Sequence, residues 1–256
     1  MLRLIVLLVF LLAFLLGLPT GASAAVPPAA PLRPSPGFQP RGPEQARGAL
    51  VWLHGSYDTD TKPSPPEPAW VRRVAGRGYD IWRFDRLPGE DPVIAGGDKL
   101  AAGLTALRAG GYRRILVAGH SRGAWIALTA LSHPGLADGV AAFSPAAHGT
   151  STASKPQALA DFGALMHAAG HAPNTRLVIA LFADDPLDPG PTVRADRIRD
   201  AARLQGFKLQ PIVLPDQPRG HYGVYDPAFD KLFGARIVRF LDPDAKRTIS
   251  TLSLSP

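Results

Sequence analysis

The chain contains no cysteine, and only two of its residues are methionine. Without cysteine no disulfide can form, so packing and hydrogen bonds have to stabilise the fold even if the protein is exported. The same absence excludes a lipid anchor on an amino-terminal cysteine. Glutamate is also scarce, and none follows Ser121.

Long apolar runs are missing except at the amino end. Leu4 to Leu18 is almost entirely apolar and follows the positive charge of Arg3. The run has about 15 residues, fewer than the roughly 20 that a membrane-spanning helix needs. Pro19 and the small residues Ala22-Ser23-Ala24 come next. This order is typical of a cleaved secretory signal peptide over residues 1–24, which predicts a periplasmic or extracellular protein. An uncleaved anchor is the alternative.

Clusters of basic residues are absent as well. The net charge is +7, from 28 basic and 21 acidic residues, but the arginines are scattered. A nucleic-acid-binding element would need a concentrated basic patch. We therefore expect no nucleic-acid partner and interpret the positive balance as a bias of composition.

Proline marks a boundary in the chain. Residues 26–43 include seven prolines, and a segment so rich in proline cannot form a helix or a central strand. We predict a Pro-rich linker over residues 25–47 and one α/β domain over residues 48–256, a length that suits a single core.

Short apolar runs alternate with amphipathic stretches along this domain. The alternation predicts a mostly parallel sheet with helices on both faces, a three-layer α/β sandwich of about six to eight strands. The expected strands are 49–53, 79–84, 114–118, 140–143, 176–182 and 209–214, and the expected helices are 68–78, 97–109, 121–132, 155–169, 192–205 and 230–241.

Gly119-His120-Ser121-Arg122-Gly123 stands where a predicted strand turns into a predicted helix. A sharp strand-to-helix turn lifts a serine hydroxyl clear of the sheet, and glycines on either side allow neighbouring chain to pass close by. The pattern predicts that Ser121 is a nucleophile, with Gly119 and Gly123 as the elbow glycines.

A serine nucleophile needs a histidine base, which in turn needs an acid, and with this elbow the chain order is serine, acid, histidine. Of the seven histidines only His221 follows the strand at 176–182, in a glycine-flanked loop. Asp184, Asp185 and Asp188 compete for the acid position in the loop after that strand. We favour Asp185, because the following proline holds it in an extended or turn conformation.

The tetrahedral intermediate needs N–H donors for its oxyanion. One is expected from Arg122, the residue after the nucleophile, and the other from Ser56 in the loop after the first strand. His54 in that loop is expected to order it through hydrogen bonds rather than to act as a base.

Together these motifs resemble the α/β-hydrolase superfamily, and in particular its esterases and dienelactone hydrolases. Leu53-His54-Gly55-Ser56 is similar to the oxyanion loop of the family, 119–123 to its nucleophile elbow, 184–189 to its acid loop and 220–223 to its histidine loop. The resemblance implies eight strands in full members, whereas this sequence offers only six convincing ones, and the departure suggests a minimal sheet. An HGGG-type oxyanion loop is absent, which argues against the branch of the family that is similar to hormone-sensitive lipase.

The expected activity is hydrolysis of a small-molecule carboxylic ester through an acyl-enzyme, with no metal or organic cofactor. The alternatives are a peptidase or amidase of the same fold and a non-catalytic binding module of the cell envelope. Residues 146–174 are expected to form a small lid. Tyr57, Phe143 and Met166 are candidates for the acyl site, although each suits an ordinary core position.

Overall fold

A computed structural model describes residues 32–56, 66–86 and 93–244 of the chain. The predicted signal peptide and Tyr57 lie outside these ranges, so export stays a prediction. Among the described residues no helix is both long enough and apolar enough to cross a membrane.

The centre of the described structure is a seven-stranded sheet with the strand order β1-β3-β2-β4-β5-β6-β7. All neighbouring strands pair in parallel except β1, which is antiparallel to β3. The strands are β1 Leu32–Pro34, β2 Gly48–Leu53, β3 Tyr79–Phe84, β4 Ile115–His120, β5 Gly139–Phe143, β6 Arg176–Leu181 and β7 Lys208–Val213.

Burial explains why these segments form parallel strands. Every residue of β2, β3, β4 and β5 is buried, as expected for strands covered by helices on both faces. The edge strand β7 is only partly buried. The six predicted strands are confirmed to within two residues at their ends.

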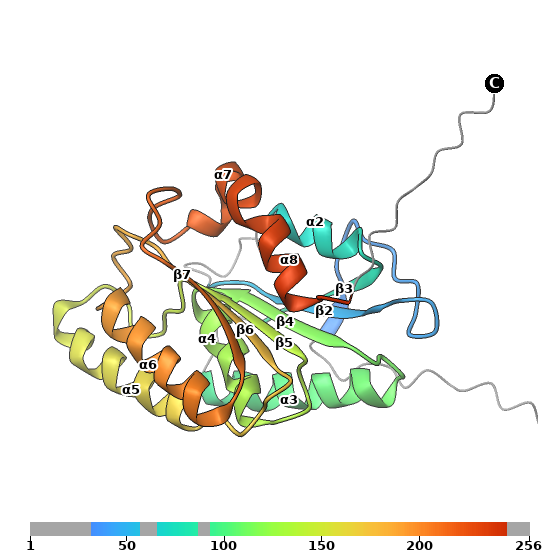
Figure 1. Cartoon of the computed structure of the whole chain (residues 1–256), viewed down its shortest axis with the longest axis horizontal. Coiled ribbons are helices and arrows are strands. Elements are labelled where there is room, and N and C mark those ends of the chain that lie inside the picture. The colour runs from blue at the N-terminus through green and yellow to red at the C-terminus, as the bar shows by residue number, and fades with distance from the viewer. Residues whose placement is uncertain (1–31, 57–65, 87–92, 245–256) are drawn as a thin grey trace, which may run out of the picture.

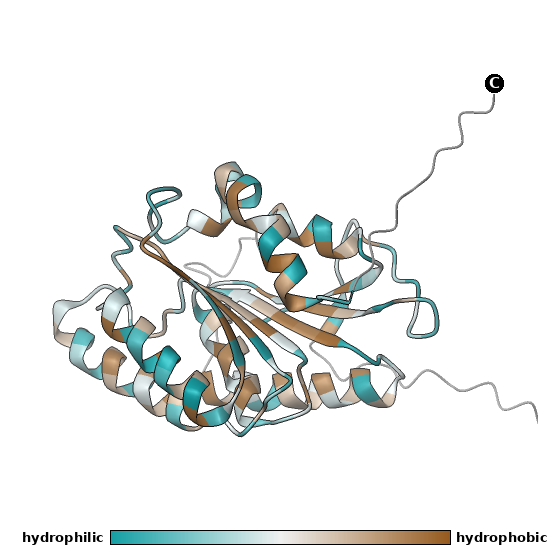
Figure 2. Ribbon diagram, viewed as in Figure 1, coloured by the Kyte–Doolittle hydropathy of each residue, from teal (hydrophilic) through white to brown (hydrophobic). Residues whose placement is uncertain are grey.

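Helices form a layer on each face of the sheet (Figure 1). One layer contains α2, α7 and α8, and the other contains α3, α4, α5 and α6. Figure 2 shows largely apolar strands in the middle layer and helices of mixed hydropathy on either side. The predicted three-layer sandwich is therefore confirmed. The helices are α2 Trp70–Ala75, α3 Val93–Ala109, α4 Arg122–Thr129, α5 Lys155–His167, α6 Pro191–Gln205, α7 Pro227–Phe229 and α8 Ala235–Leu241, with a π-helical stretch Asp230–Gly234 between the last two.

Residues 32–47 belong to the fold, so the predicted linker over 25–47 is wrong in this part. Leu32 is buried and pairs with Phe84 across the sheet edge. The buried Asp80 carboxylate accepts hydrogen bonds from the backbone N–H groups of Arg41 and Gly42 at 2.8 and 2.9 Å. Proline is tolerated in β1 because, among the described strands, β1 lies at the edge of the sheet and pairs on one side alone.

The expected lid over residues 146–174 is also corrected. Its helix, α5, connects the neighbouring strands β5 and β6 and packs against α6. Phe162 and Met166 of α5 are buried in the core cluster that includes α4, and Phe143 is buried on the other face of the sheet. α5 is thus a crossover helix, and both candidate acyl-site residues in the described ranges are core residues.

Candidate active site

Ser121 lies at the junction of β4 and α4 in a strained backbone conformation, with φ 56° and ψ −122°. Such a positive φ is costly for a residue with a side chain and persists only where the surroundings impose it. Here the Ser121 N–H donates to the Phe143 carbonyl at 3.0 Å, and its own carbonyl accepts the Trp125 N–H at 3.1 Å. The strand-to-helix turn predicted from the elbow motif is therefore present.

The two elbow glycines are required by close backbone contacts. A Cβ at Gly119 would lie 2.4 Å from the Gly123 carbonyl oxygen, and a Cβ at Gly123 would lie 2.3 Å from the His54 carbonyl oxygen. Neither oxygen belongs to a flexible side chain that can move aside. The elbow thus packs directly on the loop that leaves β2.

His221 and Asp185 form a buried pair. The His221 Nδ1 lies 2.9 Å from both carboxylate oxygens of Asp185, and both residues are at least nine-tenths buried. The Asp185 Oδ1 also accepts the Leu187 N–H at 2.9 Å, which fixes the carboxylate in its loop. The Gly220 N–H donates to the Ala183 carbonyl at 2.7 Å, so the loops that carry the two residues are joined.

The other two candidate aspartates have different partners. Asp184 is exposed and receives a hydrogen bond from the Arg219 Nε at 2.7 Å, which lowers the pKa of its carboxyl. Asp188 has a buried side chain and lies 3.5 Å from Arg194. Of the three, Asp185 is therefore the residue that the structure brings to His221.

His120 joins the nucleophile to the histidine loop, a role that the sequence did not reveal. Its Nε2 donates to the His221 carbonyl at 2.9 Å, and the centroids of the two rings are 4.8 Å apart. Burial, aided by the nearby His221, lowers the pKa of His120 to about 4, so its ring is neutral at pH 7. Because His120 directly precedes Ser121, this bond sets the His221 loop beside the elbow.

The predicted oxyanion residues also lie together. The Arg122 Nε donates to the Ser56 hydroxyl at 2.8 Å. A Cβ at Gly55 would lie 3.3 Å from the Ser121 Cβ, so the loop after β2 borders the nucleophile. Arg122 is the first residue of α4, where a backbone N–H has no acceptor within its own helix.

His54 orders this loop, as its position predicted. Its Nε2 accepts the Arg86 N–H at 3.1 Å, so its Nδ1 carries the proton and donates to the Gly55 carbonyl at 2.5 Å. The Arg86 guanidinium donates to the His54 carbonyl at 2.6 Å. Burial and the charge of Arg86 lower the pKa of His54 to about 4. Arg86 is a second site residue that no sequence pattern marked.

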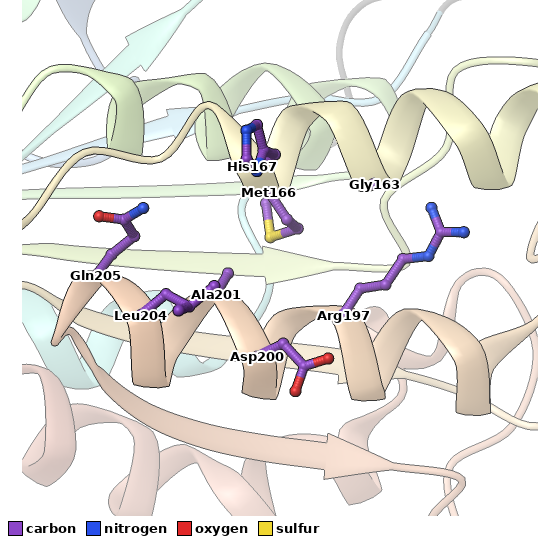
Figure 3. A pocket seen from close by; sticks show the side chains of 8 residues that line it. All are labelled: Gly163, Met166, His167, Arg197, Asp200, Ala201, Leu204 and Gln205. Atoms are coloured by element: carbon purple, nitrogen blue, oxygen red, sulfur yellow. The ribbon is translucent and has the colours of Figure 1, made fainter.

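Within the described ranges, His, Asp and Glu side chains form no group of three that could hold a metal ion. A groove of about 160 Å³ lies between the carboxyl-terminal halves of α5 and α6 (Figure 3). Ser121 lies at the carboxyl ends of the strands. In a parallel α/β sheet the carboxyl ends of the connecting helices lie at the opposite edge of the sheet. The groove is therefore separate from the candidate active site. It is lined by Gly163, Met166, His167, Arg197, Asp200, Ala201, Leu204 and Gln205.

No family model and no curated protein sequence matches the chain, but solved structures do. An esterase of Pyrococcus furiosus is 18% identical, and the match covers 80% of this chain and 86% of that one with a TM-score of 0.53. A putative dienelactone hydrolase from Klebsiella pneumoniae is 16% identical, with 79% and 90% covered and a TM-score of 0.51. Dipeptidyl peptidase 4 of Porphyromonas gingivalis is 16% identical with a TM-score of 0.56, but this match covers 82% of our chain and only 32% of the peptidase. At such identities the likeness shows the fold alone.

Proposed function

We propose that this chain, which has the α/β-hydrolase fold, is a serine hydrolase that cleaves carboxylic esters with Ser121 as its nucleophile. The observation that carries the proposal is the buried His221–Asp185 pair, held through His120 beside a serine in a strained elbow. A nucleophile, a base and an acid that orients the base are the groups that acyl transfer requires.

In the proposed reaction the His221 Nε2 takes the Ser121 hydroxyl proton as the serine oxygen attacks the ester carbonyl carbon. The Asp185 carboxylate accepts a hydrogen bond from the His221 Nδ1–H, which leaves Nε2 free to act as the base, and its negative charge stabilises the imidazolium that forms. The N–H groups of Ser56 and Arg122 stabilise the oxyanion.

The imidazolium then returns its proton to the departing alcohol, and an acyl-enzyme remains on Ser121. Water attacks this acyl group, again with His221 as the base. The products are a carboxylic acid and an alcohol, and the balance requires no cofactor.

Esters are favoured over peptides by the extent of the structural matches. The matches with the esterase and the dienelactone hydrolase cover most of both partners, whereas the peptidase match covers less than a third of the peptidase. A peptidase or amidase remains the second candidate, because the same fold and the same three residues can cleave an amide.

Hydrolysis of short-chain aryl esters, compared with prolyl and aminoacyl anilides, tests the proposal. We expect the purified protein to cleave the esters with the higher kcat/KM, and Ser121→Ala to lose at least about 10³-fold of this activity. Faster cleavage of the anilides would replace the ester assignment by a peptidase. Ester cleavage that persists unchanged in Ser121→Ala would refute the mechanism.

A further inference from the structure

Arg194, on the first turn of α6, is an almost fully buried arginine, with 1% of its surface exposed. Its guanidinium lies 4.7 Å from the centre of the Phe162 ring and 5.6 Å from that of Trp125. Burial lowers the pKa of Arg194, and the nearby Asp188 and Asp185 oppose this effect. A charge is retained in such surroundings only where specific partners stabilise it.

The partners of Arg194 belong to two loops of the candidate active site. Its Nη1 donates to the Pro145 carbonyl at 2.7 Å and lies 3.5 Å from the Asp188 Oδ1. Pro145 precedes Ala146, whose N–H donates to the Ser121 carbonyl at 3.2 Å. One guanidinium therefore connects the acid loop with the chain that supports the nucleophile.

Asp188 extends this connection to the His221–Asp185 pair. The Asp188 N–H donates to the Asp185 carbonyl at 3.2 Å, and its Oδ1 accepts the Gly190 N–H at 3.0 Å. Burial raises the pKa of Asp188, while Arg194 acts in the opposite direction, and the charges of Asp185 and His221 also act on this carboxyl. Asp188 is thus a second carboxylate within electrostatic range of the candidate base.

We propose that Arg194 and Asp188 are positioning residues for the Ser121 reaction: Arg194 fixes the acid loop against the nucleophile turn, and the Asp188 carboxylate adds negative charge around the His221 imidazolium. This inference rests on the proposed function. It gives a role in the reaction to two residues that touch neither the substrate nor the reacting atoms.

Besides Asp188, several charged and titratable groups lie around His221. Asp185 contacts its Nδ1, and the rings of His120 and Tyr222 pack on its ring. The nearby Arg219 donates a hydrogen bond to the Asp184 carboxylate. Asp188→Asn removes a negative charge and leaves only Asp185 to offset the charge of Arg194, so protonated His221 loses stabilisation.

The test is the rate at which a fluorophosphonate probe labels Ser121, measured from pH 4.5 to 9. Labelling requires neutral His221, so the rate falls on the acid side. We expect Asp188→Asn to move the midpoint of this acid limb down by about 0.5 to 1 pH unit. The double variant Asp188→Asn/Arg194→Met removes both charges and returns the midpoint to that of the wild type.

A second variant tests the positioning role directly. Lysine keeps the charge of Arg194, but its ammonium nitrogen ends about one bond short of Nη1, the atom that contacts both the Pro145 carbonyl and Asp188. We expect Arg194→Lys to lower the maximal labelling rate about tenfold while the acid limb stays in place. Arg197→Lys is the matched control, since Arg197 lies one turn later on α6 and donates to the Leu159 carbonyl, and it should label at the wild-type rate. Thermal unfolding of each variant confirms that it is folded.

An unchanged acid limb in folded Asp188→Asn, or a wild-type rate in Arg194→Lys, would overturn the inference while the proposed function stands. If Asp188→Asn does not fold, the Arg194→Lys rate decides the question. Absence of labelling in the wild type would instead refute the proposed function itself.

Discussion

At the scale of single residues, two neutral histidines shape the candidate site as much as His221 does. His54 and His120 are buried, and each uses its ring hydrogen bonds to hold a loop next to Ser121. Burial lowers the pKa of each to about 4, well under the ordinary value of 6.5. Neutral rings in these positions keep additional positive charge away from His221.

These shifts predict a loss of stability in acid. The unfolded chain takes up protons on both histidines below pH 6.5, whereas the folded protein takes them up only near pH 4. The free energy of unfolding is therefore highest above pH 6.5, where both histidines are neutral in either state, and it declines as the pH falls toward 4. We expect His120 alone to account for about 2 kcal/mol of lost unfolding free energy between pH 7 and pH 5.

Urea unfolding at the two pH values measures this effect, and His120→Gln is the comparison. Glutamine can still donate to the His221 carbonyl but does not titrate, so the variant should lose about 2 kcal/mol less than the wild type over this interval. Equal losses in the two proteins would show that His120 is already protonated in the folded state or is exposed.

The acidic residue that pairs with His221 could be predicted from the sequence only in part. The sequence narrows the choice to three aspartates in one loop, because chain order and the preceding strand place the loop. The final choice depends on partners that are distant in the sequence: Arg219 binds Asp184, Arg194 lies beside Asp188, and Asp185 is left to His221. No spacing rule contains these pairings.

At the scale of elements, the elbow depends on a contact between backbones. Gly123, in the first turn of α4, lies against the Leu53 and His54 carbonyls at the end of β2. This contact brings the oxyanion loop to Ser121, so the glycine serves both packing and the proposed chemistry.

Gly123→Ala tests this contact. Its Cβ would meet the His54 carbonyl oxygen at 2.3 Å, and we expect the unfolding free energy to fall by about 3 kcal/mol or more, since the strand or the helix has to move. Gly76→Ala is the control: Gly76 ends α2 with φ −62°, and the nearest atom to its Cβ would be at 3.4 Å. Urea unfolding should place the control within about 1 kcal/mol of the wild type. Similar stability in both variants would contradict the account of the elbow.

Element prediction succeeded for the buried strands and failed at two connections. Strands such as β2 and β4 are continuous apolar runs, so their pattern identifies them. The short strand β1 was not predicted because the prolines of residues 26–43 suggested a linker. Its edge position, which permits proline, is a property of the sheet. The role of α5 was predicted wrongly as a lid because a crossover helix and a lid helix have the same helical periodicity of apolar residues.

At the scale of the whole molecule, parallel pairing brings the site together. β4 ends at His120, directly before Ser121, β6 leads to Asp185, and the chain after β7 carries His221. Residues 36 to 100 positions apart therefore meet at the carboxyl edge of one sheet. This edge is where open α/β sheets bind their ligands. The groove between α5 and α6 lies at the other end and takes no part in the proposed reaction.

The central claim is that Ser121 is an activated nucleophile served by His221 and Asp185. Its most direct test is labelling of the whole protein with a fluorophosphonate, with the modified residue located by peptide mass spectrometry. We predict one adduct, on Ser121, which is absent in Ser121→Ala, forms at least about 10³-fold more slowly in Asp185→Asn and forms at close to the wild-type rate in Asp184→Asn. No adduct, an adduct on another residue, or equal rates in the two aspartate variants would contradict the account.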